Sequence, residues 1–268
     1  MPIPWSALLG LFSAYATFAV LISLSWVFIS ACSRNSLYAL VICLTCWTIW
    51  AVIIPRAVSI YAETHTVLPS RYVFNKKIED GFFKGIDGDG NAAARRKQLL
   101  RDLLKQYQVD TVTQLPVNFE GLSMQAAEDY NSRVYRHYAD RLEVQLLEQE
   151  AVTARYSLLN PFTAIRALSM NLAAADLRHY LQFLHQAQKY RDDFMRRLNM
   201  DMAKHADNRN PYAYKPSPDF YKQLPPFLPE TAGDSTYLYR YALTLLGWSI
   251  ALMIGFLAIS RTINANAK

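Results

Sequence analysis

The sequence predicts an all-α membrane protein with three transmembrane helices and a large α-helical extracytoplasmic domain inserted between the second and the third. Charge is distributed very unevenly along its 268 residues. From Trp5 to Pro55 the only charged side chain is that of Arg34, and residues 241–260 carry none. All 22 acidic residues lie between Glu63 and Asp234. The apolar and the water-soluble parts are therefore separate segments of the chain.

Each apolar segment is long enough to cross a bilayer, because a helix needs roughly 20 consecutive apolar residues to span the hydrocarbon core. The segments cover residues 8–31, 37–54 and 241–259. A cleaved signal peptide is the alternative for the first segment. That segment lacks a basic flank, however, and exceeds the usual apolar core of roughly 7 to 15 residues. We therefore expect three spans.

These spans divide the chain into three regions. Residues 1–55 form a transmembrane hairpin, and residues 241–268 form the third span and a short cytoplasmic tail. The region between them, residues 56–240, is the predicted extracytoplasmic domain.

Basic residues next to the spans predict the orientation. The turn between the first two spans carries Arg34, and the tail after the third carries Arg261 and Lys268. Short loops with Lys and Arg remain in the cytoplasm, whereas long domains are largely exempt from this bias. We therefore expect the Arg34 turn and the C-terminus inside, and the N-terminus and the large domain outside.

The large domain begins with a connector, residues 57–70, and continues with helical signals. Helices are predicted at residues 72–83 and 92–107, and the Gly and Asp residues of segment 85–90 predict a turn between them. The second helix carries four leucines on one side, which predicts a buried face. These are Leu99, Leu100, Leu103 and Leu104.

Two long helices follow, at residues 123–159 and 172–206. Asn160 and Pro161 suit the cap and the first turn of a helix that follows the first of them. Spacings of three and four predict one apolar face on each long helix, and two such faces can pack as an antiparallel pair. The first face comprises Ala127, Tyr130, Val134, Tyr138, Leu142 and Leu146, and the second comprises Leu177, Leu181, Leu184, Ala187, Phe194, Leu198 and Met202. Residues 210–235 contain six prolines and predict an extended, irregular connector.

Composition excludes several classes of function. Basic residues of the large domain are interleaved with acidic ones, so the electrostatic footprint of a nucleic-acid-binding protein is absent. The three cysteines, Cys32, Cys43 and Cys46, lie in or at the edge of the hairpin, so disulfides cannot cross-link the large domain. The spans contain no ionisable residue that would indicate a proton pathway.

Motifs for catalysis, metals and cofactors are also missing. Residues 87–91 superficially resemble a calcium loop, but Ala92 and Gln98 occupy positions where such a loop needs Gly and Glu. The five histidines are dispersed, and there is no P-loop, Rossmann glycine pattern or nucleophile elbow. We therefore expect no catalytic residue, no metal and no cofactor, and the chain is not predicted to be an enzyme.

A series of short motifs runs through the large domain in a fixed order. It starts with Leu115-Pro116-Val117-Asn118-Phe119-Glu120-Gly121-Leu122, Glu128 and Tyr130, and continues with Leu159-Asn160-Pro161-Phe162, Ala164-Ile165-Arg166, Leu168-Ser169-Met170, Asp176, Phe183, Ala187, Tyr190-Arg191 and Leu198-Asn199. In this order the motifs resemble the extracytoplasmic domain of the bacterial ABC-2 type permeases that carry the DUF3526 domain. Pro55-Arg56 directly after a span also fits, and the resemblance covers roughly residues 20–262.

The motif positions are our candidate site residues, and their residue types suggest architectural roles. Pro116 and Gly121 can bracket a turn, Asn118 can cap a helix and Pro161 can begin one. The resemblance supplies no catalytic residue. The full set is Pro116, Asn118, Gly121, Glu128, Pro161, Arg166, Ser169, Asp176, Tyr190, Arg191 and Asn199.

The resemblance implies the membrane component of an ABC transporter, an exporter driven by a separate cytoplasmic ATPase subunit. It implies a multi-pass protein of the bacterial inner membrane with its large loop in the periplasm. Family members usually have a longer N-terminal half with further spans, so we expect either a half-permease that works with a second permease chain or as a homo-oligomer, or a shortened form of a longer permease. The alternative is a membrane-anchored periplasmic scaffold or sensing module without transport.

Overall fold

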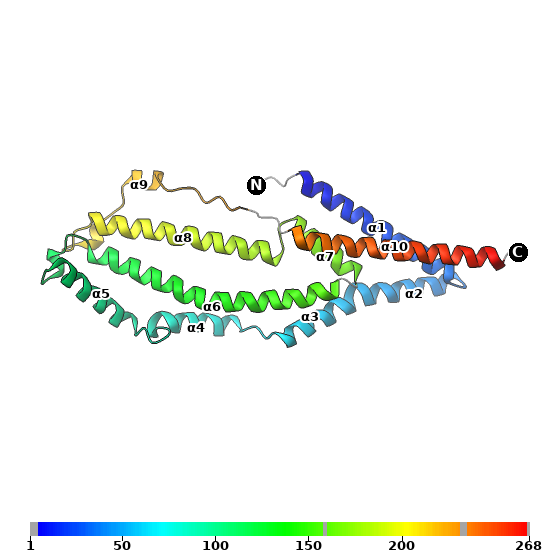
Figure 1. The fold of residues 1–268 in the computed structure, drawn as a ribbon, viewed down its shortest axis with the longest axis horizontal. Helices are drawn as coiled ribbons and strands as arrows, with labels where there is room; N and C mark the ends of the chain where they lie inside the picture. The colour runs from blue at the N-terminus through cyan, green and yellow to red at the C-terminus, as the bar shows by residue number, and fades with distance from the viewer. Residues whose placement is uncertain (1–4, 158–159, 231–234, 267–268) are drawn as a thin grey trace. The chain divides into compact units, whose positions relative to one another are not determined.

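The computed structural model of the chain describes residues 5–157, 160–230 and 235–266, and for 235–238 and 259–266 the backbone alone. These residues form helices joined by turns, and the described part contains no strand (Figure 1). They fall into two compact units that interleave in sequence. The first comprises Met1–Val67, Gln145–Gln182 and Thr231–Lys268, and the second comprises Leu68–Val144 and Phe183–Glu230.

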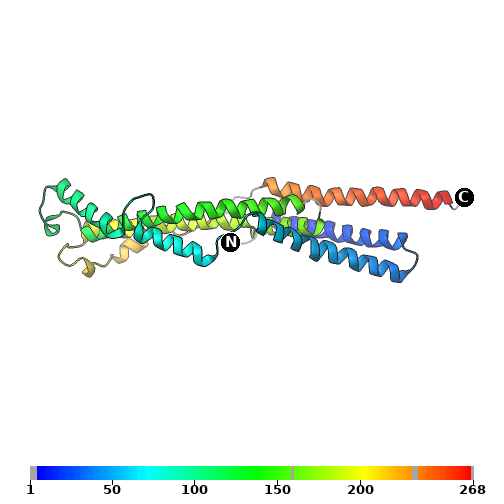
Figure 2. The same cartoon turned by 90° about the horizontal axis from the view of Figure 1, so that it is seen from below.

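The first unit contains the three helices that are long and apolar enough to cross a membrane, as the sequence predicts. Helix α1 (Trp5–Cys32) and helix α2 (Ser36–Thr48) form a hairpin around a short turn (Figure 2). Asn35 caps α2 by accepting a hydrogen bond from the N–H of Tyr38. The third such helix is the apolar part of α10 (Ser235–Asn266). The side chain of Arg261 and all of Lys268, on which the predicted orientation partly rests, lie outside the described residues.

The second membrane-length helix extends beyond its predicted end. A π-helical turn, η1 (Ile49–Ile53), connects α2 directly to α3 (Ile54–His65), so residues 57–65 are helical rather than part of a connector. Pro55 explains the π turn, because its ring cannot donate an N–H and would collide with the carbonyl four residues earlier in a regular α-helix. In the π turn the N–H of Ile54 bonds instead to the oxygen of Ile49.

Helix α7 (Pro161–Leu172) packs against α1 and α10 in the first unit. Its Phe162 ring meets Phe18 edge to face, with centroids 5.2 Å apart. An alanine-rich, close-packed cluster results, and burying it removes apolar surface from solvent or lipid. The buried members are Ala14, Ala164, Ile165, Leu168, Tyr241 and Leu245.

The second unit opens with α4 (Arg71–Lys84) and α5 (Ala92–Tyr107), which confirm the two predicted helices and the turn between them. The turn uses positive φ angles at Gly85, Gly88 and Gly90. The hydroxyl of Tyr130 accepts from the N–H of Ile86 at 2.8 Å and so fixes the turn to a later helix. The four predicted leucines of α5 form one apolar cluster with Leu115 and Phe119.

Both long helices begin at different residues from those predicted. Helix α6 (Phe119–Ser157) starts four residues earlier, and its predicted end at Leu159 lies outside the described residues. Helix α8 (Leu177–His205) starts later, because Ala174 adopts a left-handed conformation with φ 52°. The N–H of Ala175 then bonds to the oxygen of Met170, and that of Ala174 to the oxygen of Asn171. This is a Schellman motif, which normally carries Gly at the left-handed position, so an alanine there does not signal the break.

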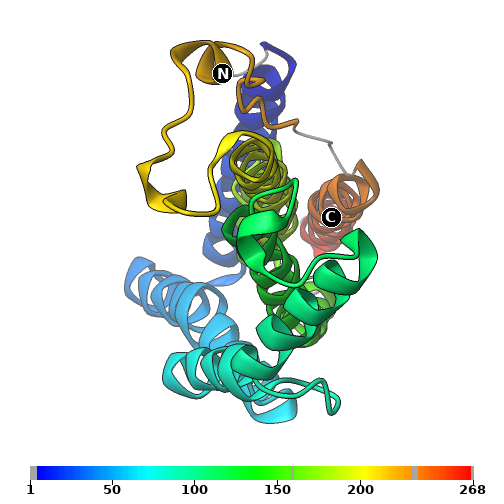
Figure 3. The ribbon, with the colours of Figure 1, turned by 90° about the vertical axis from the view of Figure 1, so that its left-hand side faces the viewer.

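The face between α6 and α8 is more polar than predicted. Tyr130 and Val134 are buried as expected, but they pack against Phe82 and Ile86 of the α4 segment rather than against α8, and Ala127 is exposed. Gln125 and Ser132 are buried towards α8 instead, where they bond to Asn199 and Asp192. After α8 the chain follows a wide loop, yellow to orange in Figure 3, and this loop contains two short helices, η3 (Pro211–Ala213) and α9 (Pro218–Lys222), that the proline content concealed.

Candidate functional site

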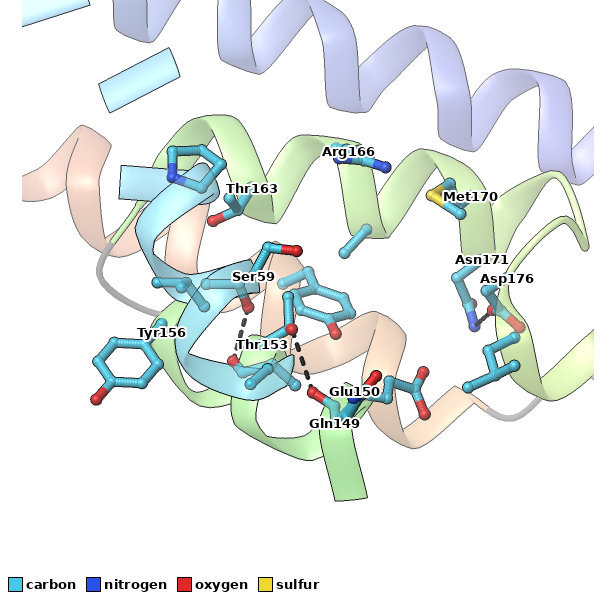
Figure 4. A pocket seen from close by; sticks show the side chains of 18 of the residues that line it. Ser59, Gln149, Glu150, Thr153, Tyr156, Thr163, Arg166, Met170, Asn171 and Asp176 are labelled. Carbon is cyan, nitrogen blue, oxygen red and sulfur yellow. Dashed lines mark hydrogen bonds between the residues drawn. The ribbon is translucent and has the colours of Figure 1, made fainter. Parts of the chain in front are cut away.

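A cavity of about 390 Å³ lies within the first unit (Figure 4). Helix α3 contributes one wall, the end of α6 a second, and α7 with the start of α8 a third. The wall residues are largely apolar, among them Ile54, Val58, Ala62, Ala167, Met170 and Leu177. Polar groups enter between them, which is the usual composition of a site for a small or amphiphilic ligand.

Two of the charged residues that line the cavity form an ion pair. Nε of Arg178 lies 3.2 Å from a carboxylate oxygen of Glu150, and both side chains are mostly buried. Nearby, the side-chain amide of Gln149 donates to the carbonyl oxygen of Thr66 at 2.7 Å. These contacts join the start of α8 and the end of α3 to the end of α6.

Asp176 is held by hydrogen bonds at the start of α8. Burial disfavours its charged form, but the backbone N–H and the ring of His179 and the amide of Asn171 all donate to the carboxylate. Together these hydrogen bonds outweigh burial and hold the pKa of Asp176 below its ordinary value. Asp176 is therefore ionised at neutral pH and acts as the N-cap of α8.

Two further ionisable residues line the cavity without an ion-pair partner among the described residues. Arg166 on α7 and Glu63 on α3 are both exposed, so they lie where the cavity meets its surroundings. The carboxylate of Glu63 accepts a long hydrogen bond, 3.4 Å, from the hydroxyl of Ser59. One positive and one negative charge thus remain available to a ligand.

Asn160 joins the cavity helices to the π turn. Its Oδ1 accepts from the N–H of Phe162 and so caps α7, and its Nδ2 donates to the carbonyl oxygen of Trp50 at 2.8 Å. The π-helical partner of that oxygen would be the N–H of residue 55, and Pro55 has none. Asn160, fully buried, therefore satisfies a carbonyl that the proline leaves without a donor.

The other motif residues gather in the second unit, around the start of α6. The N–H of Asn118 donates to the oxygen of Ala203 at 2.7 Å, and its Oδ1 accepts from the N–H of Gly121. A Cβ on Gly121 would lie 2.5 Å from the nitrogen of Ala203, so only glycine permits this approach. The amide of Asn199 donates to Gln125. The residues at these motif positions therefore hold the start of α6 in contact with the end of α8.

Polar contacts continue along the two helices, and one ties α8 to the loop that follows it. Arg191 donates to Glu128 at 2.8 Å, and Tyr190 donates through its hydroxyl to the carbonyl oxygen of Pro225. Asp192 accepts from Ser132 at 2.8 Å. Pairs of this kind, mostly exposed, each stabilise by a few tenths of a kcal/mol, on the order of 0.2 to 1. Their value here is to fix the register of α6 against α8.

The structure thus separates the predicted site residues into two groups. Arg166 and Asp176 line the cavity. Pro161 is the first residue of α7, the helix that carries Arg166, and the hydroxyl of Ser169 donates a hydrogen bond to the carbonyl oxygen of Arg166. Asn118, Gly121, Glu128, Tyr190, Arg191 and Asn199 belong to the second unit, as does Pro116, which is exposed just before α6. Each group is described within its own unit.

Several residues of structural importance escaped the sequence analysis. Asn208 donates to the oxygens of Leu115 and Val117 and accepts from the N–H of Phe119, so it clamps the first motif from far along the chain. In the sequence alone, nothing distinguishes three charged residues of the cavity from ordinary surface charges; these are Glu63, Glu150 and Arg178. Only their three-dimensional neighbours distinguish them, and no local pattern reports those neighbours.

Among the described residues no group of three or more His, Cys, Asp and Glu is placed to hold a metal ion. The chemistry that the cavity offers is recognition through an apolar wall with fixed charges. The described chain is thus a helical protein with three helices capable of crossing a membrane and an amphipathic cavity in the unit that contains them.

Comparison with known proteins gives its family. Residues 71–230 match the family described as a domain of unknown function, DUF3526, and the chain belongs to that family. The match begins at the first residue of α4 and ends at the last residue of the second unit. No curated protein and no solved structure matches the chain.

Proposed function

We propose that this chain is the membrane component, a permease, of a bacterial ABC-type exporter that is powered by a separate cytoplasmic ATPase. One observation supports this most strongly. The family segment, residues 71–230, lies between the second and third membrane-length helices. That is where the motif series resembling the ABC-2 type permeases occurs. The chain itself carries no nucleotide-binding or catalytic motif, so we assign it no enzymatic activity.

The proposed orientation follows from the charges at the helix ends. Arg34 lies in the short turn between α1 and α2 and would face the cytoplasm of a bacterial inner membrane. The family segment would then project into the periplasm. The Arg34 turn leaves little cytoplasmic surface for an ATPase, so we further propose that a second permease chain, or a second copy of this one, completes the transporter.

Affinity purification tests the proposal directly. The tagged full-length chain would be extracted from membranes in mild detergent, and co-purifying proteins identified by mass spectrometry against an unrelated tagged inner-membrane protein. We expect enrichment of an ATP-binding subunit, with or without a second permease. Repeated recovery of periplasmic or envelope proteins alone would contradict the transporter assignment.

Cysteine labelling in intact cells tests the orientation. Cys32 is exposed beside the Arg34 turn, so it can be kept while Cys43 and Cys46 are replaced by serine. A second variant serves as the comparison. All three of its native cysteines are replaced by serine, and it carries Tyr212→Cys, because Tyr212 in η3 is 74% exposed. A membrane-impermeant maleimide should label residue 212 in intact cells and Cys32 only after lysis. The reverse pattern would overturn the orientation.

A membrane-anchored periplasmic scaffold or sensing module is the second candidate. The ladder of polar contacts between α6 and α8, including Arg191 with Glu128 and Arg196 with Asp129, favours it because such helix pairs also serve as rigid binding platforms. Under that function, deletion of the gene would leave transport unaffected while a periplasmic partner lost its attachment to the membrane.

A further inference from the structure

We propose that the cavity of the first unit binds a zwitterionic phospholipid with a free ammonium group, an ethanolamine phospholipid, by its headgroup and glycerol region. The acyl chains would remain in the leaflet on the side of the membrane away from the Arg34 turn. This inference goes beyond the transporter proposal and requires only that the membrane-length helices are inserted. It rests on the depth of the cavity, the nature of its wall and its two available charges.

The depth of the cavity in the bilayer follows from the geometry of the helix that lines it. The helix that starts at Ser36 continues to His65 and contributes cavity residues from Ile54 to Glu63. At about 1.5 Å per residue, Ile54 lies ~29 Å and Ala62 ~41 Å along the helix from the turn at Asn35. A hydrocarbon core is ~30 Å thick, and the headgroup layers bring the bilayer to ~40 to 45 Å. With the turn at one edge of the core, the opposite headgroup layer lies ~30 to 37 Å along the helix, so the cavity begins at that layer and extends past its outer edge.

The wall suits the region where headgroup and acyl chain meet. Val58, Ala62 and Met170 present apolar surface, while the hydroxyls of Ser59 and Thr163 and the amide of Asn171 lie among them. Figure 4 shows Ser59 facing the cavity from α3, opposite Thr163 and Met170 on α7. A volume of about 390 Å³ is too small for two acyl chains but accommodates a headgroup with the adjoining glycerol esters.

Charge complementarity selects the headgroup. Glu150 and Arg178 neutralise each other, and Asp176 is already engaged by three hydrogen bonds from His179 and Asn171. Arg166 and Glu63 therefore remain. A guanidinium is the side chain best matched to a phosphate, which it can bind through two parallel N–H donors. The carboxylate of Glu63 in turn fits an ammonium group.

The test uses the full-length chain in detergent and the thermal unfolding midpoint as readout, because a ligand that binds only the folded state raises Tm with concentration. Phosphatidylethanolamine, phosphatidylglycerol and phosphatidylcholine with identical acyl chains would each be titrated into the micelles. Free phosphoethanolamine would show whether the headgroup alone is sufficient. We expect phosphatidylethanolamine to act at the lowest mole fraction and free phosphoethanolamine to have little effect, since it lacks the apolar contacts.

Paired variants locate the site. Arg166→Gln should raise the mole fraction for half-maximal stabilisation about tenfold for every phospholipid, since each has a phosphate, a change of about 1.4 kcal/mol. Glu63→Gln should remove the preference for phosphatidylethanolamine over phosphatidylglycerol and leave the response to phosphatidylglycerol intact. Ser59→Phe should fill the cavity and abolish stabilisation by all three lipids. The controls are Arg155→Gln and Glu148→Gln, exposed residues of the same unit that do not line the cavity.

Two results would overturn the inference. Equal stabilisation by all lipids, unchanged in the cavity variants, would indicate only a nonspecific lipid annulus. A preference for phosphatidylglycerol that survives Glu63→Gln would indicate an anion site. Neither result depends on an ATPase, so the inference and the transporter proposal can fail independently.

Discussion

Asn160 is completely buried and uses both ends of its side-chain amide. Asn160→Asp separates the two roles, because aspartate keeps the capping oxygen but cannot donate to Trp50. The carbonyl of Trp50 would then lack a donor and face a negative charge. We expect a loss of about 1 to 3 kcal/mol in stability, measured as a lower Tm in detergent.

Asn35→Asp is the matched control for this substitution. Asn35 also caps a helix through its side-chain oxygen, but it is exposed and the structure gives it no second role. Its replacement should leave Tm nearly unchanged. Equal effects at the two positions would mean that the hydrogen bond to Trp50 contributes nothing beyond capping.

The carboxylate of Asp176 makes part of the stability dependent on pH. Its pKa is lowered in the folded state, so its contribution is complete above the unfolded pKa of about 3.9 and is lost as the pH falls through the lower folded value. Asp176→Asn should therefore cost about 1 kcal/mol at pH 7, and its difference from the wild type should shrink towards pH 3. Unfolding midpoints at pH 7, 5 and 3 measure this. Asp193→Asn, at an exposed position of the same helix, should match the wild type throughout.

At the scale of single helices, the break between α7 and α8 stores strain. Ala174 is the left-handed residue of a Schellman motif, a conformation about 1 to 2 kcal/mol less favourable for alanine than a right-handed one. Glycine relieves it at the cost of extra entropy in the unfolded chain, so Ala174→Gly should stabilise by about 0.5 to 1 kcal/mol. Ala173→Gly, next to it at φ −84°, has no strain to relieve and should destabilise. An increase of Tm in both variants would refute the argument.

The same break shows which helix boundaries can be predicted from the sequence and which cannot. The bounds of α5 could be predicted because Asn91 caps its start, glycines precede it, and four leucines mark its buried side. The start of α8 could not, because an alanine occupies the position where glycine would signal a stop. The π turn was hidden for a related reason, since Pro55 indicates a break but the helix absorbs it by a change of hydrogen bonding.

The pairing of α6 with α8 illustrates a different limit. Apolar spacing predicted which helices are long and amphipathic, but it assigned to the contact with α8 the exposed Ala127 and also Tyr130 and Val134, which pack against the α4 segment. The amide of buried Asn199 donates to the side-chain oxygen of buried Gln125, whose own amide donates to Asp129, and Gly121 lets the two backbones approach. A polar residue can be buried whenever a partner is within reach, and periodicity carries no information about partners.

At the scale of the whole molecule, hydropathy alone was sufficient to predict three membrane-length helices. It could not predict which helices pack on them. Helix α7 lies in the soluble part of the sequence by charge, yet its apolar face packs against α1 and α10 in the first unit. The cavity could not be predicted either, because its lining combines α3, residues 146–178 and α10, three segments that are distant from one another in sequence.

This packing predicts opposite effects of one pair of substitutions in two contexts. A fragment of residues 71–230 covers the whole family match but lacks α1 and α10, so Ile165 and Leu168 of α7 would lose the neighbours that bury them. Exposed apolar patches promote association, so the fragment should aggregate or bind detergent, and Ile165→Ser with Leu168→Ser should make it more soluble and monomeric. In the full-length chain the same pair should lower Tm strongly, because it places two hydroxyls in a close-packed apolar cluster. Size-exclusion chromatography of the fragment and thermal unfolding of the full chain measure the two effects.

The contrary outcome is a fragment that is already monomeric without detergent and is unaffected by the two substitutions. It would mean that α7 needs no membrane-length helix to cover it. That result would favour the scaffold function over the permease.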